Sequence, residues 1–366
     1  QLQVNNLSHI DIALLLFLYS LAFGTGYYNH VTYATGSKPV GISTADLNND
    51  GKPDIAITNS DSDTMAVYFN AGNGTFLTPT IYPAGDYTHS LRICDVNDDN
   101  KNDIIVSNAG VASRNVGVFL NTGNGTFLPQ VTYTNLTSAY LFSVADVNSD
   151  NKPDIILPNI YSNTVDILLN TGSGTFLSRT VYPIGINPHT AAVADVNTDN
   201  KPDIIVANRA SNNVGILINS GSGIFQSQIT YPTGNSVAYL DVADVNRDGK
   251  PDIVVPNIGS ANIGVLINAG NGTFLPQVTY LTSSAPIAVT LADINGDNIL
   301  DIVATLSGSS IGIYLNAGNG TFLSEINYIT GSGPHYSVVT DLNGDNRPDI
   351  IVTNYNSDTI SVLLHI

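Results

Sequence analysis

The chain has 366 residues, 43% of them apolar, which suffices for one large all-β domain with an extensive core. Its 12 basic and 30 acidic residues give a net charge of -18, which excludes a nucleic-acid binder that works through phosphate contacts and disfavours attraction to an anionic membrane. The single cysteine, Cys94, excludes an internal disulfide, and we expect it to be a small buried hydrophobic side chain.

An apolar run occupies residues 12–23, near the start of the chain. It is too short to span a bilayer, which needs about 20 apolar residues. Two interpretations remain open. The run resembles the apolar core of a signal peptide, and DIALLL (11–16) also resembles DILLN (166–170), which favours a degenerate strand from a preceding repeat. Residues 1–26 are therefore treated as a separate N-terminal segment.

An acidic stretch of nine residues then recurs seven times. The copies are DLNNDGKPD (46–54), DVNDDNKND (95–103), DVNSDNKPD (146–154), DVNTDNKPD (195–203), DVNRDGKPD (244–252), DINGDNILD (293–301) and DLNGDNRPD (341–349). Their starts are spaced by 49, 51, 49, 49, 49 and 48 residues. Seven copies at one period indicate an array of a single supersecondary unit.

Each unit contains four short β runs separated by turn signals. An apolar run such as SVAD (143–146) precedes the acidic loop, and DIIV (103–106) exemplifies the run after it. NTVDILLN (163–170) and GNGTFLPQVTY (123–133) exemplify the third and fourth runs. Four strands in a repeat of 40–50 residues are typical of a β-propeller blade. The sequence therefore predicts an all-β, seven-bladed propeller over residues 27–366.

The two ends of the repeat array predict how the propeller closes. The seventh unit stops at TISVLLHI (359–366) without a fourth strand, and YYNHVTY (27–33) resembles TFLPQVTY (126–133). We therefore expect an N-terminal strand at about 27–34 to complete the last blade beside the C-terminal strand. This arrangement removes the open edge that would otherwise favour aggregation.

The acidic loops are predicted to bind metal. Positions 1, 5 and 9 are always Asp, position 3 is always Asn, and position 6 is always Gly or Asn, which tolerate the positive φ of a chain that curls around an ion. Alternating oxygen ligands with a backbone carbonyl at position 7 favour calcium over zinc or copper, and magnesium demands a tighter geometry. The predicted side-chain and carbonyl ligands are Asp46, Asn48, Asp50, Lys52, Asp54; Asp95, Asn97, Asp99, Lys101, Asp103; Asp146, Asn148, Asp150, Lys152, Asp154; Asp195, Asn197, Asp199, Lys201, Asp203; Asp244, Asn246, Asp248, Lys250, Asp252; Asp293, Asn295, Asp297, Ile299, Asp301; and Asp341, Asn343, Asp345, Arg347, Asp349.

The charge balance is consistent with up to seven Ca²⁺ ions, one per blade. Positions 1, 5 and 9 of the loops hold 21 of the 30 acidic residues, and seven ions, with fourteen positive charges, would bring the net charge from -18 to -4. Without ions, three carboxylates in each loop repel one another. The sixth loop departs most from the pattern, because Ile299 and Leu300 stand where the other loops carry Lys or Arg and usually Pro.

The repeat resembles the FG-GAP/VCBS repeat, which forms the calcium-binding blades of integrin α-subunit propellers and of many secreted adhesion and sugar-binding proteins. The motif D-x-N-x-D-G/N-x-x-D lies between the first two strands of each unit, and the GNGTF stretch (72–76 is its first copy) is similar to the VCBS variant. The resemblance implies one Ca²⁺ in each acidic loop and an extracellular location. It implies no particular ligand.

The ligand is expected on the face opposite the acidic loops, where the most variable loops lie. His89, Tyr140, His189 and His335 all fall six residues before the first Asp of a loop and are expected to ring the mouth of the central channel. Arg114 and Arg209 are the basic residues of the variable loops on that face. Rings of Tyr, His and Asn suit a sugar or a peptide loop, although channel packing would also explain them.

Three functions follow, in order of preference. The first is a secreted or cell-surface adhesion module, monomeric, that binds a protein or glycan ligand. The second is a propeller lectin with repeated sugar sites between blades. The third is a polysaccharide-degrading enzyme, which the scarcity of acidic residues outside the loops disfavours. Possible glycan acceptors in N-x-S/T triplets are Asn6, Asn73, Asn124, Asn135, Asn271 and Asn319.

Overall fold

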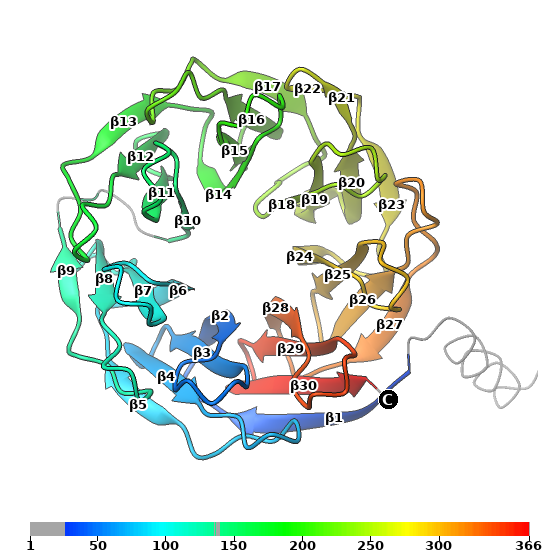
Figure 1. Ribbon diagram of the computed structural model, residues 1–366. Helices are drawn as coiled ribbons and strands as arrows, with labels where there is room; N and C mark the ends of the chain where they lie inside the picture. Colours follow the sequence, from blue (N-terminus) through cyan, green and yellow to red (C-terminus); the bar gives the residue numbers. More distant parts are fainter. Residues whose placement is uncertain (1–25, 135, 137–139, 366) are drawn as a thin grey trace, which may run out of the picture.

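A computed structural model describes residues 26–134, 136 and 140–365. Strands β1 to β30, apart from the small β21–β22 hairpin, form seven four-stranded antiparallel sheets arranged in a ring (Figure 1). The predicted seven-bladed β-propeller is therefore confirmed. The N-terminal apolar run and two glycosylation triplets, Asn6 and Asn135, lie outside the described residues. No helix in the described part of the chain is long and apolar enough to cross a membrane.

Each blade follows the order predicted from the repeat, with its first strand nearest the central channel (Figure 1). The blades comprise β2 (Pro39–Ala45), β3 (Asp54–Asn59), β4 (Thr64–Tyr68) and β5 (Thr80–Pro83); β6 (Thr88–Cys94), β7 (Asp103–Asn108), β8 (Asn115–Phe119) and β9 (Val131–Tyr133); β10 (Ser143–Ala145), β11 (Asp154–Asn159), β12 (Thr164–Leu168) and β13 (Thr180–Pro183); β14 (Pro188–Ala194), β15 (Asp203–Asn208), β16 (Asn213–Leu217) and β17 (Ile229–Pro232); β18 (Asp241–Ala243), β19 (Asp252–Asn257), β20 (Asn262–Leu266) and β23 (Val278–Leu281); β24 (Pro286–Ala292), β25 (Asp301–Leu306), β26 (Ser310–Tyr314) and β27 (Ile326–Ile329); and β28 (Pro334–Thr340), β29 (Asp349–Asn354), β30 (Thr359–His365) and β1 (Tyr27–Ala34). The fifth blade also has a 3-10 turn, η1 (Ile258–Ser260), and a small hairpin of β21 (Asn268–Gly270) and β22 (Thr273–Phe274).

The core lies between neighbouring blades. The second strand of each blade is buried along its whole length, because both of its faces pack on adjacent sheets. This explains why these strands begin with continuous apolar runs such as DIIV instead of alternating ones. One cluster, for example, joins Ile205 and Ile216 of the fourth blade to Ile253 and Val255 of the fifth. Each blade can bury its faces only in the closed ring.

An aromatic pair joins the outer parts of neighbouring blades. The Tyr of a fourth strand packs edge to face on the Phe of the next blade's G-T-F or G-I-F turn, at 5.5 Å between ring centres for Tyr182 and Phe225. The same pairing recurs in Tyr33–Phe76, Tyr82–Phe127, Tyr133–Phe176, Tyr231–Phe274 and Tyr280–Phe322. Such pairs add about 0.5–1.5 kcal/mol beyond the area they bury.

The ring closes as the sequence predicts. β1 pairs antiparallel with β30, with Val31 opposite Val362 and Tyr33 opposite Ile360, and it forms the outer strand of the seventh blade (Figure 1). The Tyr68 hydroxyl of the first blade donates to Ala34 O at 2.8 Å. The seventh blade is thus built from both ends of the described chain.

Hydroxyl groups join the inner strands of some blades near the end opposite the acidic loops. Thr58 Oγ1 donates to His89 O of the next blade at 2.8 Å, and Ser107, Thr305 and Thr353 make equivalent bonds. Pro158, Ala207 and Pro256 occupy this position in the third, fourth and fifth blades, and these side chains have no hydroxyl. We call the four bonds the hydroxyl clamps.

Candidate functional site

The seven acidic loops fold in the same way, around their first aspartate. In the first loop Asp46 Oδ2 accepts the N–H of Gly51 at 2.8 Å, and the corresponding bond occurs in the other six. Position 6 has positive φ throughout, for example 80° at Gly51 and 59° at Asn200, as predicted. Position 4 also has positive φ, even where it is Thr198 or Arg247, which the sequence did not predict. The backbone therefore curls twice in each loop.

The ninth aspartate is buried and supports the loop from beneath. Asp203 is fully buried, and its carboxylate accepts the N–H groups of Val196 at 3.1 Å and Asn219 at 2.7 Å. Desolvation raises the pKa of Asp203 to about 6, while these two N–H groups lower it and the charges of Asp199 and Asp195 raise it. A cation beside this carboxylate would hold it ionised.

The seventh residue neutralises part of the loop through its side chain. The ammonium group of Lys101 lies 3.0 Å from Asp99 Oδ2. Equivalent ion pairs join Lys52 to Asp50, Lys152 to Asp150, Lys201 to Asp199 and Lys250 to Asp248. The sequence predicted a role only for the backbone carbonyl at this position and did not predict the ion pair. Ile299 of the sixth loop has no charge, so that loop lacks this neutralisation.

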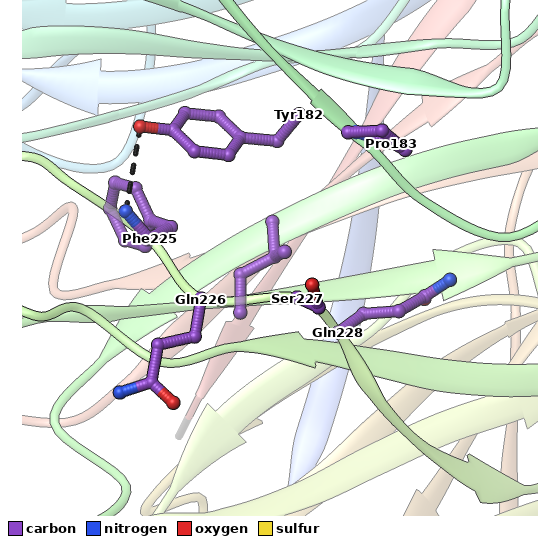
Figure 2. A pocket seen from close by; sticks show the side chains of 7 residues that line it. Tyr182, Pro183, Phe225, Gln226, Ser227 and Gln228 are labelled. Atoms are coloured by element: carbon purple, nitrogen blue, oxygen red, sulfur yellow. Dashed lines mark hydrogen bonds between the residues drawn. The ribbon is translucent and has the colours of Figure 1, made fainter.

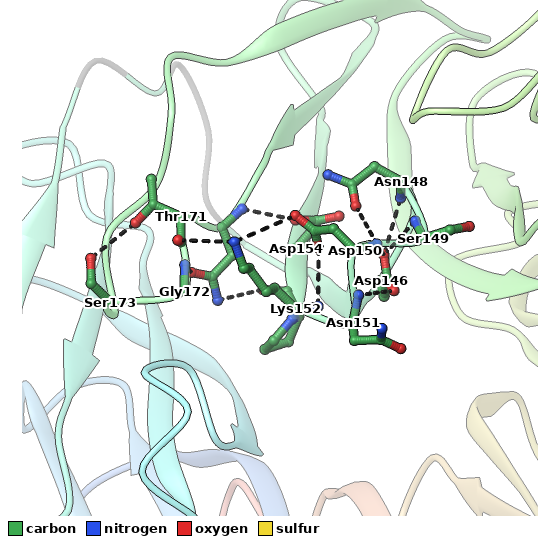
Figure 3. Close-up of polar contacts among 12 residues, drawn as sticks. Asp146, Asn148, Ser149, Asp150, Asn151, Lys152, Asp154, Thr171, Gly172 and Ser173 are labelled. Atoms are coloured by element: carbon green, nitrogen blue, oxygen red, sulfur yellow. Dashed lines mark hydrogen bonds and ion pairs between the residues drawn. The ribbon is translucent and has the colours of Figure 1, made fainter.

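The second loop gives the clearest test of whether a metal fits. Oxygen atoms of Asp95, Asp99 and Asp103 all lie within 4.8 Å of one another, whereas no other loop among the described residues meets this distance. Asn97 Oδ1, at the third predicted ligand position, is buried without a hydrogen-bond partner. Three converging carboxylates and an unused amide oxygen are the donor set that Ca²⁺ prefers. Figure 3 shows the third loop, where Asp146, Asn148 and Asp150 form hydrogen bonds within the loop.

A buried asparagine links each of the first six loops to the one before it in the ring, and His365 stands at the corresponding position of the seventh blade. Asn219 Nδ2 donates to Pro202 O of its own loop at 2.9 Å and to Val147 O of the preceding blade's loop at 2.8 Å. The same double contact is made by Asn70, Asn121, Asn170, Asn268 and Asn316. We call these residues the asparagine links. The recurring Asn two residues before G-x-G was a sequence signal that could have identified them.

We expect Asn219→Ala to lower the free energy of unfolding by about 2–4 kcal/mol, because it leaves two buried carbonyl groups without donors. Asn73→Ala, at an exposed hairpin tip, is the matched control and should cost less than about 1 kcal/mol. Urea unfolding at constant calcium measures both. Equal effects of the two substitutions would contradict the linking role of Asn219.

On the opposite face, the four predicted channel residues come together with four aromatic residues that the sequence argument missed. His89 lies 5.3 Å from Tyr140 and 6.1 Å from His335, measured between ring centres. Tyr239 connects His189, at 5.2 Å, to His335, at 6.0 Å. The complete aromatic layer consists of Tyr87, His89, Tyr140, His189, Tyr239, His335, Tyr336 and Tyr355.

The aromatic layer fills the mouth of the channel, whereas the prediction was that these residues would surround an opening. His89 and Tyr239 are only 7% and 6% exposed, because rings from five blades pack on one another. The remaining rings are partly buried, and the Nδ1 atom of His335 is fully buried. The layer is therefore a floor on which a ligand could rest.

Basic and exposed apolar side chains surround this floor. The Arg114 guanidinium lies 5.1 Å from the centre of the Tyr161 ring, and the Lys38 ammonium lies 4.6 Å from that of Tyr355. Arg209 is exposed, and its charge adds to burial in lowering the pKa of His189 to about 4. Tyr161 is 59% exposed and Val111 is 85% exposed. The predicted Arg114 and Arg209 thus both lie beside the aromatic layer.

Burial of His335 predicts a loss of stability in acid. Desolvation lowers the pKa of His335 to about 4, so the unfolded chain takes up a proton near pH 6.5 while the folded chain stays neutral. The contribution of neutral His335 to the free energy of unfolding is complete above pH 6.5 and decreases as the pH falls towards 4. We expect His335→Phe to reduce the fall in the free energy of unfolding between pH 7 and pH 5 by up to about 2 kcal/mol. Urea unfolding at both pH values measures this, with His30→Gln as control, and an unaltered pH dependence in His335→Phe would contradict it.

Small pockets recur between the outer parts of the blades. One, of about 290 Å³, is lined by Tyr182, Phe225 and Gln228 (Figure 2). Equivalent pockets of about 370 Å³ and 310 Å³ lie beside Tyr133–Phe176 and Tyr231–Phe274. Each combines two aromatic rings with polar side chains. Repeated sites between the blades were predicted from the sequence in general terms, without these residues.

Cys94 differs from its expected environment. It lies half-exposed at the end of β6 instead of being fully buried. Desolvation, together with the charges of Asp103 and Asp95, raises the pKa of its thiol to about 12. The side chain is therefore a protonated thiol at neutral pH and a poor nucleophile.

Solved structures similar to this chain share its fold at low sequence identity. A lectin of Agrocybe aegerita with specific recognition of non-reducing terminal N-acetylglucosamine has 22% identity and a TM-score of 0.58, covering 81% of each chain. BBS1N, in complex with ARL6DN, has 13% identity and a TM-score of 0.67, covering 93% of this chain and 96% of that one. Virginiamycin B lyase from Staphylococcus aureus has 15% identity and a TM-score of 0.64, covering 92% and 99%. Both binding proteins and an enzyme thus have this fold.

The curated proteins compared with the chain give no match. The model of the FG-GAP-like repeat matches residues 46–106, 95–157, 146–206, 195–255, 257–304 and 296–352. These stretches contain all seven acidic loops, including the asparagines and aspartates that build them. The chain therefore belongs to the FG-GAP-like repeat family.

Proposed function

We propose that this protein is an extracellular, calcium-stabilised binding module that recognises a protein or glycan ligand on the face of the aromatic layer. The observation that carries the proposal is the convergence of His and Tyr rings from five blades on one surface, beside Arg114, Arg209 and the exposed Tyr161. Aromatic rings and arginine are enriched in the energetically dominant parts of interfaces. The loops that carry these side chains differ from blade to blade, whereas the acidic loops are uniform.

Calcium has a structural role in this proposal. The donor set of the second loop, with its unused Asn97 amide oxygen, and the buried ninth aspartates support Ca²⁺ as the ion that neutralises the loops. The ligands would be the side chains at positions 1, 3, 5 and 9 and the carbonyl at position 7. FG-GAP-like repeats are typical of extracellular proteins, where calcium is abundant. The ion is not required to touch the ligand, because it lies at the other face.

The test separates binding from folding. We would probe the purified protein against arrayed glycans and in cell-surface pull-downs, with calcium and with EGTA. The double variant Tyr161→Ser and Arg209→Ser should reduce binding at least tenfold without a change in melting temperature. Ile81→Ser, on the exposed outer rim, is the control and should bind normally. If the double variant retained full binding, the ligand site would lie elsewhere.

A second candidate function, glycan binding between the blades, is favoured by the three recurring pockets. Their volumes of about 290 to 370 Å³ lie near the lower end of the range for small-molecule sites. The similar lectin recognises non-reducing terminal N-acetylglucosamine, so this sugar is the first probe. Stoichiometry distinguishes the candidates: pockets between blades should bind several equivalents per chain, and the aromatic layer should bind one. A polysaccharide-degrading activity has no specific observation in its favour.

A further inference from the structure

The central channel is accessible from the acidic-loop end and closed at the other. The last three residues of every first strand are half-exposed, for example Ser43–Ala45, whereas Pro39–Ile42 of the same strand are buried. A first strand has a hydrogen-bonded neighbour on one edge only, so its other edge faces the channel. The same gradient of exposure occurs in β6 and β24. The accessible part of the channel therefore ends at the aromatic layer.

Two charged side chains occupy this part of the channel at the same depth. Arg92 of the second blade and Asp241 of the fifth each lie three residues before the first aspartate of their loops. Each of the two residues therefore lies about 10 Å along its strand from the first aspartate of its loop, because three residues of extended chain span this distance. The other blades carry uncharged residues at this position, namely Ser43, Ser143, Ala192, Thr290 and Val338. The opposite charges belong to β6 and β18, which lie on opposite sides of the central channel (Figure 1).

Arg92 is held in place but not neutralised by contact. Its Nη1 donates to Leu91 O at 2.8 Å, and the guanidinium carbon lies 5.8 Å from the centre of the Phe142 ring. No ion pair within 4.0 Å involves Arg92 in the part of the chain that the structure describes. A guanidinium group has five N–H donors and stays charged in proteins. Its remaining donors are therefore available to a molecule in the channel.

Asp241 is oriented by backbone groups and keeps free acceptor capacity. Its Oδ1 accepts the N–H of Val242, and its Oδ2 accepts the N–H of Leu291 in the next blade, both at 2.8 Å. Each carboxylate oxygen has a second lone pair. Burial raises the pKa of Asp241 and lowers that of Arg92, whereas the charge of each residue shifts the pKa of the other in the opposite direction and favours both charged forms. The two side chains therefore interact electrostatically without an ion pair within 4.0 Å. A gap between unlike charges favours a molecule that carries both.

We propose that the channel binds a small zwitterion of the α-amino acid type, with its carboxylate on Arg92 and its ammonium group on Asp241. A guanidinium and a carboxylate form short, charge-assisted and often bidentate hydrogen bonds. A simple anion would be attracted by Arg92 but repelled by Asp241. A simple cation would be attracted by Asp241 but repelled by Arg92. A molecule that carries both charges can form an ion pair with each of the two residues. This site is separate from the ligand face and from the pockets between the blades.

The test is isothermal titration of the calcium-saturated protein. The probes are glycine, β-alanine and γ-aminobutyrate, which carry their charges at increasing separation, with acetate and ethylammonium as singly charged controls. At least one zwitterion should bind ten times more tightly than either control. Arg92→Gln and Asp241→Asn should each weaken that zwitterion at least tenfold. Arg114→Gln, at the other face, should leave the affinity unchanged.

Three results would overturn the proposal. These are no binding by any zwitterion at 10 mM (a chosen ceiling, about 2.7 kcal/mol of binding free energy), acetate binding as tightly as the best zwitterion, and unchanged affinity in Arg92→Gln. The first would show that the channel has no zwitterion site, and the second would indicate a simple anion site. If a channel variant fails to fold, the comparison of zwitterions with acetate in the unmodified protein still decides. Loss of glycan or protein binding at the other face would not affect this outcome.

Discussion

Removal of calcium is expected to lower the melting temperature by about 20 °C. If each loop binds Ca²⁺ with a Kd of ~0.1 mM and free calcium is ~2 mM, each ion stabilises the fold by about 1.8 kcal/mol. Seven such sites together would match the whole stability of a typical domain. For a chain of this size, 1 kcal/mol corresponds to about 2 °C. Scanning calorimetry in calcium and in EGTA measures the difference.

Single-loop variants show whether the ions act through the loops. Asp99→Asn removes one ligand from the second loop, where three carboxylates converge within 4.8 Å. It should lower the melting temperature by a few degrees in calcium and have little effect in EGTA. Asp86→Asn changes an exposed aspartate at the other face and is the control. An identical melting curve of the unmodified protein in calcium and in EGTA would exclude structural calcium.

Deletion of residues 1–34 should be the most damaging change to the chain itself. It removes β1, which pairs with β30 over seven residue pairs, and it removes Tyr33 from its contact with Phe76. The exposed edge of β30 would then carry the apolar sequence TISVLLH. We expect a loss on the order of 5 kcal/mol or more, and aggregation through the open edge.

The control for this deletion is removal of residues 1–25 alone, which leaves β1 in place. Size-exclusion chromatography and thermal unfolding compare the two proteins. The shorter deletion should remain monodisperse with an unchanged transition, and the longer one should aggregate or lose its cooperative transition. A monomer with a normal transition after the longer deletion would show that β1 does not close the ring.

The fold was predictable because its information is repeated. One loop of three aspartates would have been ambiguous, whereas seven copies at one spacing define the number of blades and, by the missing strand after His365, the mode of closure. The contacts between blades were not predictable in the same way. Asn219 could be recognised as recurrent, but its partner Val147 O belongs to another blade's backbone. A backbone carbonyl that accepts a hydrogen bond cannot be recognised from the identity of its residue.

The aromatic layer was predicted in part, for a physical reason. The common spacing of six residues identified His89 and His335, but alternation along a strand would place Tyr336 on the opposite side from His335. The structure shows a register shift between Pro334 and Ser337, and such bulges re-aim side chains. Tyr239 precedes the regular part of its strand, which begins only at Asp241. Irregular backbone thus brings together aromatic rings that the regular alternation of side chains along a strand would place on opposite sides.

The hydroxyl clamps divide the ring into two unequal arcs. Thr305, Thr353, Thr58 and Ser107 join consecutive blades from the sixth through the first to the third. The arc from the third blade to the sixth has Pro158, Ala207 and Pro256 in their place. A closed ring is usually weakest where its two chain ends meet. The junction of the two chain ends therefore lies where these hydroxyl bonds reinforce the ring. The other arc is held by different side chains: Ser143 Oγ donates to Ala191 O, and Asp241 Oδ2 accepts the N–H of Leu291.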